Sequence, residues 1–105
     1  MTGRDIFLKL ARSRHSARMR CLGVRYIPLR EEHPVVMVSF SIPRKVGGAV
    51  VRNRIRRRLR SVLREMAGQM LPGAYLVTVR ENLNTAKYCN LVEIMNTIIK
   101  KATTP

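Results

Sequence analysis

The sequence is poor in aromatic and in acidic side chains. Aromatic residues make up 5% of the 105 residues, and there is no tryptophan. Because hydrophobic residues still account for 46%, the core must be mainly aliphatic. The 6 acidic residues include no D-x-D or similar spacing, and the closest group, Glu31-Glu32 beside His33, is typical of a solvated turn. A metal-dependent nuclease site within this chain is therefore not expected.

Long apolar runs and cysteine motifs are missing as well. No run of about 18 apolar residues is present, and the first residues lack the apolar segment of a secretory signal peptide. Cys21 and Cys89 form no C-x-x-C or metal-binding spacing, which is typical of free thiols in a cytosolic protein. We therefore expect a cytoplasmic protein without a membrane partner.

Positive charge is what the sequence has in excess. Lysine and arginine number 21 against 6 acids, which gives a formal net charge of +15. Arginine outnumbers lysine by 16 to 5, and guanidinium groups favour bidentate contacts with phosphates. A polyanionic partner would relieve the self-repulsion of such a chain. The length fits a single domain, residues 1–105, and we interpret it as an RNA-binding domain.

Hydrophobic periodicity predicts six elements. They are a short helix over residues 4–13, strands over 22–29 and 35–42, a long helix over 49–67, a strand over 74–80, and a last helix capped by Asn84 or Thr85. Residues 13–20 are polar and basic without a clear period. The order αββαβα predicts an α+β domain in which helices pack on one mixed sheet.

The long helix carries the strongest functional signal. Between Arg44 and Arg64 there are nine basic residues and no acid, and an apolar stripe around Ile55 and Leu59 lies opposite most of them. The ordinary alternative is a solvated basic face, but the missing counter-charges favour a phosphate-binding surface. Asn53 can accept as well as donate hydrogen bonds, so it can contact a base or a 2′-hydroxyl, although it can also be an exposed residue of no consequence.

The segment from Ser41 to Arg64 closely resembles the signature of the bacterial ribonuclease P protein subunit. That pattern has a strand ending in serine and two basic residues, then x-Gly-x-Ala-Val, then Arg-Asn-Arg and a basic helix. The positions that match it are Gly47, Ala49, Val50, Arg52, Asn53, Arg54, Arg57 and Arg60. The order of elements extends the resemblance to most of the chain.

The resemblance implies a single-domain α/β sandwich with a left-handed βαβ crossover, as in some ribosomal proteins. It also implies that the chain binds ribonuclease P RNA and the 5′ leader of precursor tRNA. The chain would then be an endoribonuclease only within a ribonucleoprotein, whose RNA subunit uses Mg²⁺, with neither catalytic nor metal-binding residues of its own. The expected RNA-binding residues are Arg44, Lys45, Arg52, Asn53, Arg54, Arg56, Arg57, Arg60 and Arg64. The expected leader-cleft residues are Phe7, Tyr26 and Phe40.

Some alternatives stay open at this point. Tyr26 and Phe40 can equally be core residues. The first helix offers one phenylalanine, Phe7, where family members usually have two. A ribosomal or assembly RNA-binding protein without a nuclease partner is the alternative function. A DNA partner is not expected, because no helix-turn-helix pair is evident.

Overall fold

The computed structural model describes residues 15–19, 21–28 and 35–103, and the predicted first helix and Phe7 lie outside them. The described residues form one four-stranded sheet with two long helices, so the predicted mixed α+β class is confirmed. The strands are β1 (His15–Arg18), β2 (Leu22–Ile27), β3 (Val36–Ser41) and β4 (Gly73–Val79). The helices are α2 (Ala49–Met66) and α3 (Tyr88–Thr103).

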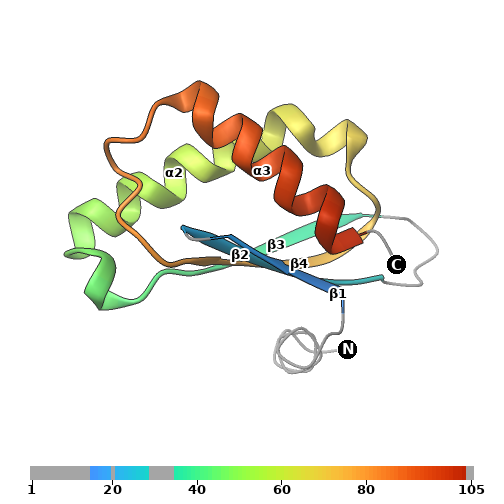
Figure 1. The fold of residues 1–105 in the computed structure, drawn as a ribbon, viewed down its shortest axis with the longest axis horizontal. Coiled ribbons are helices and arrows are strands. Elements are labelled where there is room, and N and C mark those ends of the chain that lie inside the picture. The colour runs from blue at the N-terminus through green and yellow to red at the C-terminus, as the bar shows by residue number, and fades with distance from the viewer. Residues whose placement is uncertain (1–14, 20, 29–34, 104–105) are drawn as a thin grey trace.

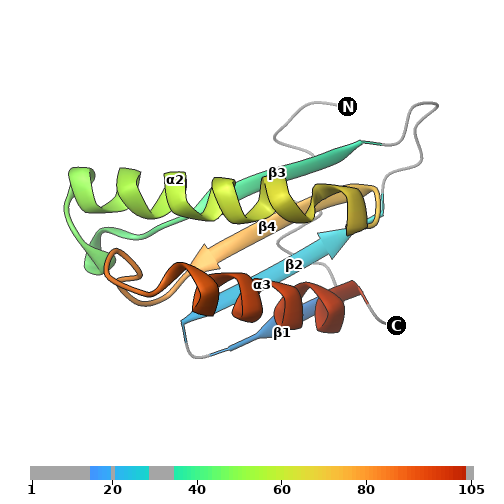
Figure 2. The same cartoon turned by 90° about the horizontal axis from the view of Figure 1, so that it is seen from above.

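Both long helices lie on one side of the sheet (Figure 1), whose strand order is β1-β2-β4-β3 (Figure 2). β2 pairs antiparallel with both β1 and β4, whereas β3 pairs parallel with β4. One face of the sheet is buried and the other is not, because successive side chains of a strand point to opposite faces. Leu22, Val24 and Tyr26 of β2 are buried on the face that α2 and α3 cover, and Arg25 lies on the opposite face.

β1 is a strand that the predicted order αββαβα lacks. It has the sequence HSAR, and three of its four residues are exposed. It lies at an edge of the sheet and pairs with β2 from His15 opposite Tyr26 to Arg18 opposite Gly23. A short edge strand that buries almost no apolar surface leaves no hydrophobic period to detect, which is why it was missed.

The connection from β3 through α2 to β4 is a left-handed crossover. In Figure 2, α2 and α3 lie between the viewer and the sheet, and the path from β3 over α2 to β4 moves to the left of the strand direction. Crossover connections between parallel strands of one sheet are right-handed in about 98% of cases, so this connection is unusual. The handedness implied by the family resemblance is therefore found in this chain.

The core lies between the helices and the sheet. α2 contributes Ile55, Leu59, Val62, Leu63 and Met66, and α3 contributes Leu91, Met95, Ile98, Ile99 and Ala102. β4 lies between β2 and β3 and is the most buried strand, with six of its seven residues buried. Two 3₁₀ turns bracket α2, at Arg44–Val46 and at Ala67–Gln69. None of the helices in the described ranges is long and apolar enough to cross a membrane.

The last helix starts later than predicted. It was expected to be capped by Asn84 or Thr85, but α3 begins at Tyr88. Residues 83–86 instead form a loop whose carbonyl oxygens accept hydrogen bonds from the Arg58 side chain of α2. A contact between distant parts of the chain therefore moves the helix start.

Candidate nucleic-acid interface

The outer face of α2 presents a shallow basic hollow of about 410 Å³, which we call the arginine surface. It is lined by Asn53, Arg56, Arg57 and Arg60. These side chains share one face because residues three and four apart lie side by side on a helix. The Nη1 atom of Arg56 donates to Oδ1 of Asn53 over 2.9 Å, which leaves the amide nitrogen of Asn53 to donate elsewhere. The arrangement presents donors only, as phosphate oxygens require.

The other predicted RNA-binding residues extend this surface toward both ends of α2. Arg44 and Lys45 are exposed in the 3₁₀ turn before the helix, and Arg54 and Arg64 are exposed on the helix. Arg52 is half-buried, and its Nε atom has no hydrogen-bond partner. Of the nine predicted RNA-binding residues, four line the hollow and five lie outside it, on α2 or in the turn before it.

Gly47 allows the basic turn to lie close to the start of α2. A Cβ atom at this position would lie 2.7 Å from Cγ1 and 3.0 Å from Cβ of Val51. Such distances are shorter than a carbon–carbon contact, so only glycine fits without movement of the first helical turn. The glycine of the predicted motif thus allows the close contact between the turn that carries Arg44 and Lys45 and Val51 of α2.

Arg58 belongs to the same basic run but performs a different task. Its Nη1 atom donates to the carbonyl oxygens of Leu83 and Asn84, over 2.7 and 2.8 Å, and its Nη2 atom donates to that of Ala86. The guanidinium group therefore holds the loop between β4 and α3. We call this contact the Arg58 clamp, and it removes one arginine of the run from the binding surface.

Two of the three predicted leader-cleft aromatics face the helices. Tyr26 is 6% exposed, its ring centroid lies 4.8 Å from that of Tyr75, and its hydroxyl donates to the carbonyl oxygen of Pro72 over 2.8 Å. Burial raises the pKa of both tyrosines, that of Tyr75 to about 12. Phe40 is partly buried, with the Arg60 guanidinium 5.9 Å from its ring centroid. Phe7 lies outside the described residues.

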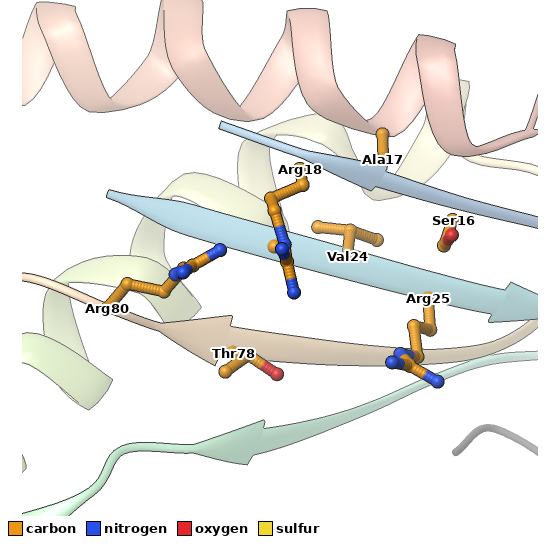
Figure 3. A pocket seen from close by; sticks show the side chains of 8 residues that line it. Ser16, Ala17, Arg18, Val24, Arg25, Thr78 and Arg80 are labelled. Atoms are coloured by element: carbon orange, nitrogen blue, oxygen red, sulfur yellow. The ribbon is translucent and has the colours of Figure 1, made fainter. Parts of the chain in front are cut away.

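A second basic site, which sequence reasoning missed, lies on the sheet face opposite α2 and α3. It is a pocket of about 250 Å³ around which Arg18, Arg25 and Arg80 lie, with Ser16 and Thr78 between them (Figure 3). The backbone nitrogen of Arg80 donates to the carbonyl oxygen of Cys21 over 2.8 Å, which holds it beside β2. Ser16 and Arg18 lie two residues apart on β1, so their side chains point to the same face of the sheet. The sequence could not place them there because β1 was not predicted as a strand.

The described part of the chain holds no group of three His, Cys, Asp or Glu residues that could bind a metal ion. Cys21 is partly buried and Cys89 is exposed, and neither is in a disulfide. Burial raises the pKa of the Cys21 thiol. The arginines that line the two basic sites can bind anions.

Comparisons with known proteins place the chain among proteins of one family. The family model described as Ribonuclease P matches residues 1–103. The ribonuclease P protein component of Thermus scotoductus is 36% identical over 103 residues, covering 97% of this chain and 59% of the relative. That of Carboxydothermus hydrogenoformans is 33% identical over 82 residues, covering 77% of this chain and 71% of the relative. The chain thus spans roughly six to seven tenths of the length of these relatives.

Solved structures match the fold over nearly the whole chain. The RNase P protein of Staphylococcus aureus superposes with a TM-score of 0.81 at 21% identity, covering 98% of this chain and 93% of that one. The RNase P protein of Thermotoga maritima gives 0.78 at 20% identity, with 95% and 94% covered.

Proposed function

The chain belongs to the ribonuclease P protein family, and from this premise we propose that it binds the catalytic RNA of ribonuclease P. In that complex it would promote the endonucleolytic removal of the 5′ leader from precursor tRNA. The observation that carries the proposal is the strip of arginines on α2, which contains no acidic residue between Arg44 and Arg64. Arginines arranged in this way neutralise phosphates and release counterions from a folded RNA.

We assign the leader of the precursor tRNA to the opposite face of the sheet. The pocket around Arg18, Arg25 and Arg80 can contact phosphates of a single strand. The ring of the buried Tyr26 points toward the helices. Tyr26 therefore lies on the other side of the sheet from this pocket and does not line it. Phe7, outside the described residues, is the remaining candidate for stacking on a leader base.

In this proposal the chemical step belongs to the RNA subunit, which would bind Mg²⁺ and hydrolyse the phosphodiester. The protein would lower the repulsion between two polyanions, so its effect should be largest where salt and Mg²⁺ are low. Such a complex would work in the cytoplasm, where precursor tRNA is made. Ribosomal RNA binding without a nuclease partner is the competing function.

Reconstitution with a bacterial ribonuclease P RNA tests the proposal. Cleavage of precursor tRNA would be measured at low Mg²⁺ with the wild type, with Arg56→Ala/Arg57→Ala, and with Lys87→Ala/Lys101→Ala, which removes two exposed charges away from the arginine surface. We expect the wild type and the lysine variant to restore cleavage and the arginine variant to fail. Tight RNA binding by the wild type without any gain in cleavage would favour the ribosomal alternative.

A further inference from the structure

An apolar groove runs between the edge strand β3 and the second half of α2. Val36, Val38 and Phe40 form one wall, since alternate residues of β3 point to the same face. Leu63 and Met70 form the other wall, and the enclosed volume is about 240 Å³. Figure 2 shows α2 lying along β3, which is the last strand of the sheet. The groove is thus bounded by sheet on one side only and open to solvent along its edge.

Two arginines form the rim of this groove. Arg60 and Arg64 are exposed and lie four residues apart on α2, so both extend over the same side. The guanidinium of Arg60 lies 5.9 Å from the ring centroid of Phe40, within the range of a cation–π contact. No acidic residue lines the groove. An apolar floor with an exclusively cationic rim suits a ligand that is planar and apolar in one part and anionic in another.

The groove is continuous with the arginine surface. Arg60 lines both the groove and the hollow that contains Asn53, Arg56 and Arg57. An RNA strand whose phosphates contact that hollow is therefore led to the groove without leaving the protein. A second copy of the chain, with its own net charge of +15, would bring cations against this rim.

We propose that the groove between β3 and α2 binds one unpaired nucleobase of the bound RNA. The base would stack on the partly exposed ring of Phe40, while Arg60 and Arg64 contact the phosphates on either side of it. This inference rests on the proposed function, because it requires RNA on α2. It adds a site that selects single-stranded over double-stranded RNA.

Two RNA probes of equal length test the site: a single-stranded 12-mer and a 12-base-pair duplex, with affinities measured by fluorescence anisotropy. Phe40→Leu keeps an apolar side chain but removes the ring, whereas Phe40→Tyr keeps the ring. We expect Phe40→Leu to lose about tenfold in affinity for the single strand and to keep its affinity for the duplex. Phe40→Tyr should bind both probes within twofold of the wild type. Tyr88→Leu, which removes an exposed aromatic on α3, should also match the wild type.

The outcomes separate this inference from the proposed function. If the wild type binds neither probe, the proposed function fails. If it binds both and Phe40→Leu loses nothing, or loses both equally, only the nucleobase site is overturned. Photocrosslinking of the wild type to a 5-iodouridine single strand covers the case of a poorly folded variant. Crosslinks in β3 would support the site, and crosslinks confined to other segments would overturn it. An RNA-free dimer that Phe40→Leu abolishes would also overturn it, since a second copy would then cover the groove.

Discussion

At the residue scale, neighbouring arginines of α2 divide into binding and fold-supporting roles. Arg57 is exposed on the arginine surface, whereas Arg58 donates to three carbonyl oxygens of residues 83–86. A helical wheel places both opposite or beside the apolar stripe and cannot show which one reaches a distant loop. The predicted binding set left Arg58 out, but its clamp could not be foreseen from the sequence.

We expect Arg58→Ala to lower the free energy of unfolding by about 1–3 kcal/mol, because partly buried carbonyls lose a charged donor. Its RNA affinity, measured well below its melting temperature, should stay within about twofold of the wild type. Arg57→Ala should change the free energy of unfolding by at most about 0.5 kcal/mol but weaken RNA binding. Urea unfolding and fluorescence anisotropy on both variants check this, and equal losses of RNA affinity would contradict it.

Tyr75 couples stability to alkaline pH. Burial raises its pKa to about 12, above the value of about 10 in the unfolded chain, so folding favours the protonated hydroxyl. Its contribution is complete below about pH 10 and is lost as the pH rises toward 12, by at most about 2–3 kcal/mol. Urea unfolding between pH 8 and 12 should show this fall in the wild type.

The Tyr75→Phe variant tests that contribution by removing the hydroxyl of Tyr75, which also ends its electrostatic interaction with Tyr26. It should be less stable at pH 8, since the carbonyl of Leu71 loses its 2.6 Å hydrogen bond, but its stability should fall less between pH 10 and 12. Identical slopes for Tyr75→Phe and the wild type would exclude Tyr75 as the source.

At the element scale, β4 begins at a glycine that no other residue can replace without strain. Gly73 has φ of +148°, and a Cβ atom there would lie 2.5 Å from the carbonyl oxygen of Ile27 and 2.6 Å from Cε1 of Tyr26. We expect Gly73→Ala to cost about 2 kcal/mol or more of stability. Gly68→Ala is the matched control, because nothing lies within 4 Å of its Cβ, and it should be neutral or slightly stabilising. Thermal melts of the two variants decide, and similar losses would contradict the expectation.

The arginines of α2 should each contribute a measurable share of the salt dependence of RNA binding. Each phosphate contact contributes about 0.7–0.9 to the slope of log affinity against log salt. Arg57→Ala should therefore reduce the slope by roughly that amount, and Lys101→Ala on α3 should leave it unchanged. Titrations at four salt concentrations check this. Equal reductions by both variants would mean that the net charge, and not the arginine surface, drives binding.

Elements with strong apolar periodicity were predicted closely, and polar ones were not. α2 was expected over 49–67 and spans Ala49–Met66, because its buried stripe repeats over five turns. β1 and the loop before α3 were missed, because their positions depend on pairing with β2 and on the Arg58 clamp. The arginine surface followed from the sequence for the same reason as α2, whereas the pocket around Arg18 and Arg80 depended on the missing strand.

At the scale of the whole molecule, the sheet separates two cationic sites. The arginine surface lies on the helix side, and the pocket around Arg18, Arg25 and Arg80 lies on the other face. The handedness of the crossover, which places α2 over β3 and β4, is invisible to periodicity and entered only through the family resemblance. The two sites share no lining residue, so we expect them to act independently unless the bound RNAs themselves interact.

We therefore expect Arg18→Ala/Arg80→Ala to weaken binding of a single-stranded leader oligonucleotide to the reconstituted complex without changing the affinity for the catalytic RNA. Arg56→Ala/Arg57→Ala should weaken binding of the catalytic RNA. The losses in the combined variant should add within about 0.5 kcal/mol, as for distant sites. Competition binding measures each step, and a leader affinity unchanged by Arg18→Ala/Arg80→Ala would remove the leader from that face.

The Arg58 clamp has a consequence for how this chain can diverge. All of its acceptors are main-chain carbonyls, which every amino acid supplies. Side chains at positions 84 and 86 can therefore drift over generations while the clamp survives, whereas a change at position 58 has no substitute elsewhere. The clamp therefore constrains the residue type at position 58 but not those of the loop. Related chains that keep this arginine should tolerate varied loop sequences, and those that lack it should have a loop of different conformation.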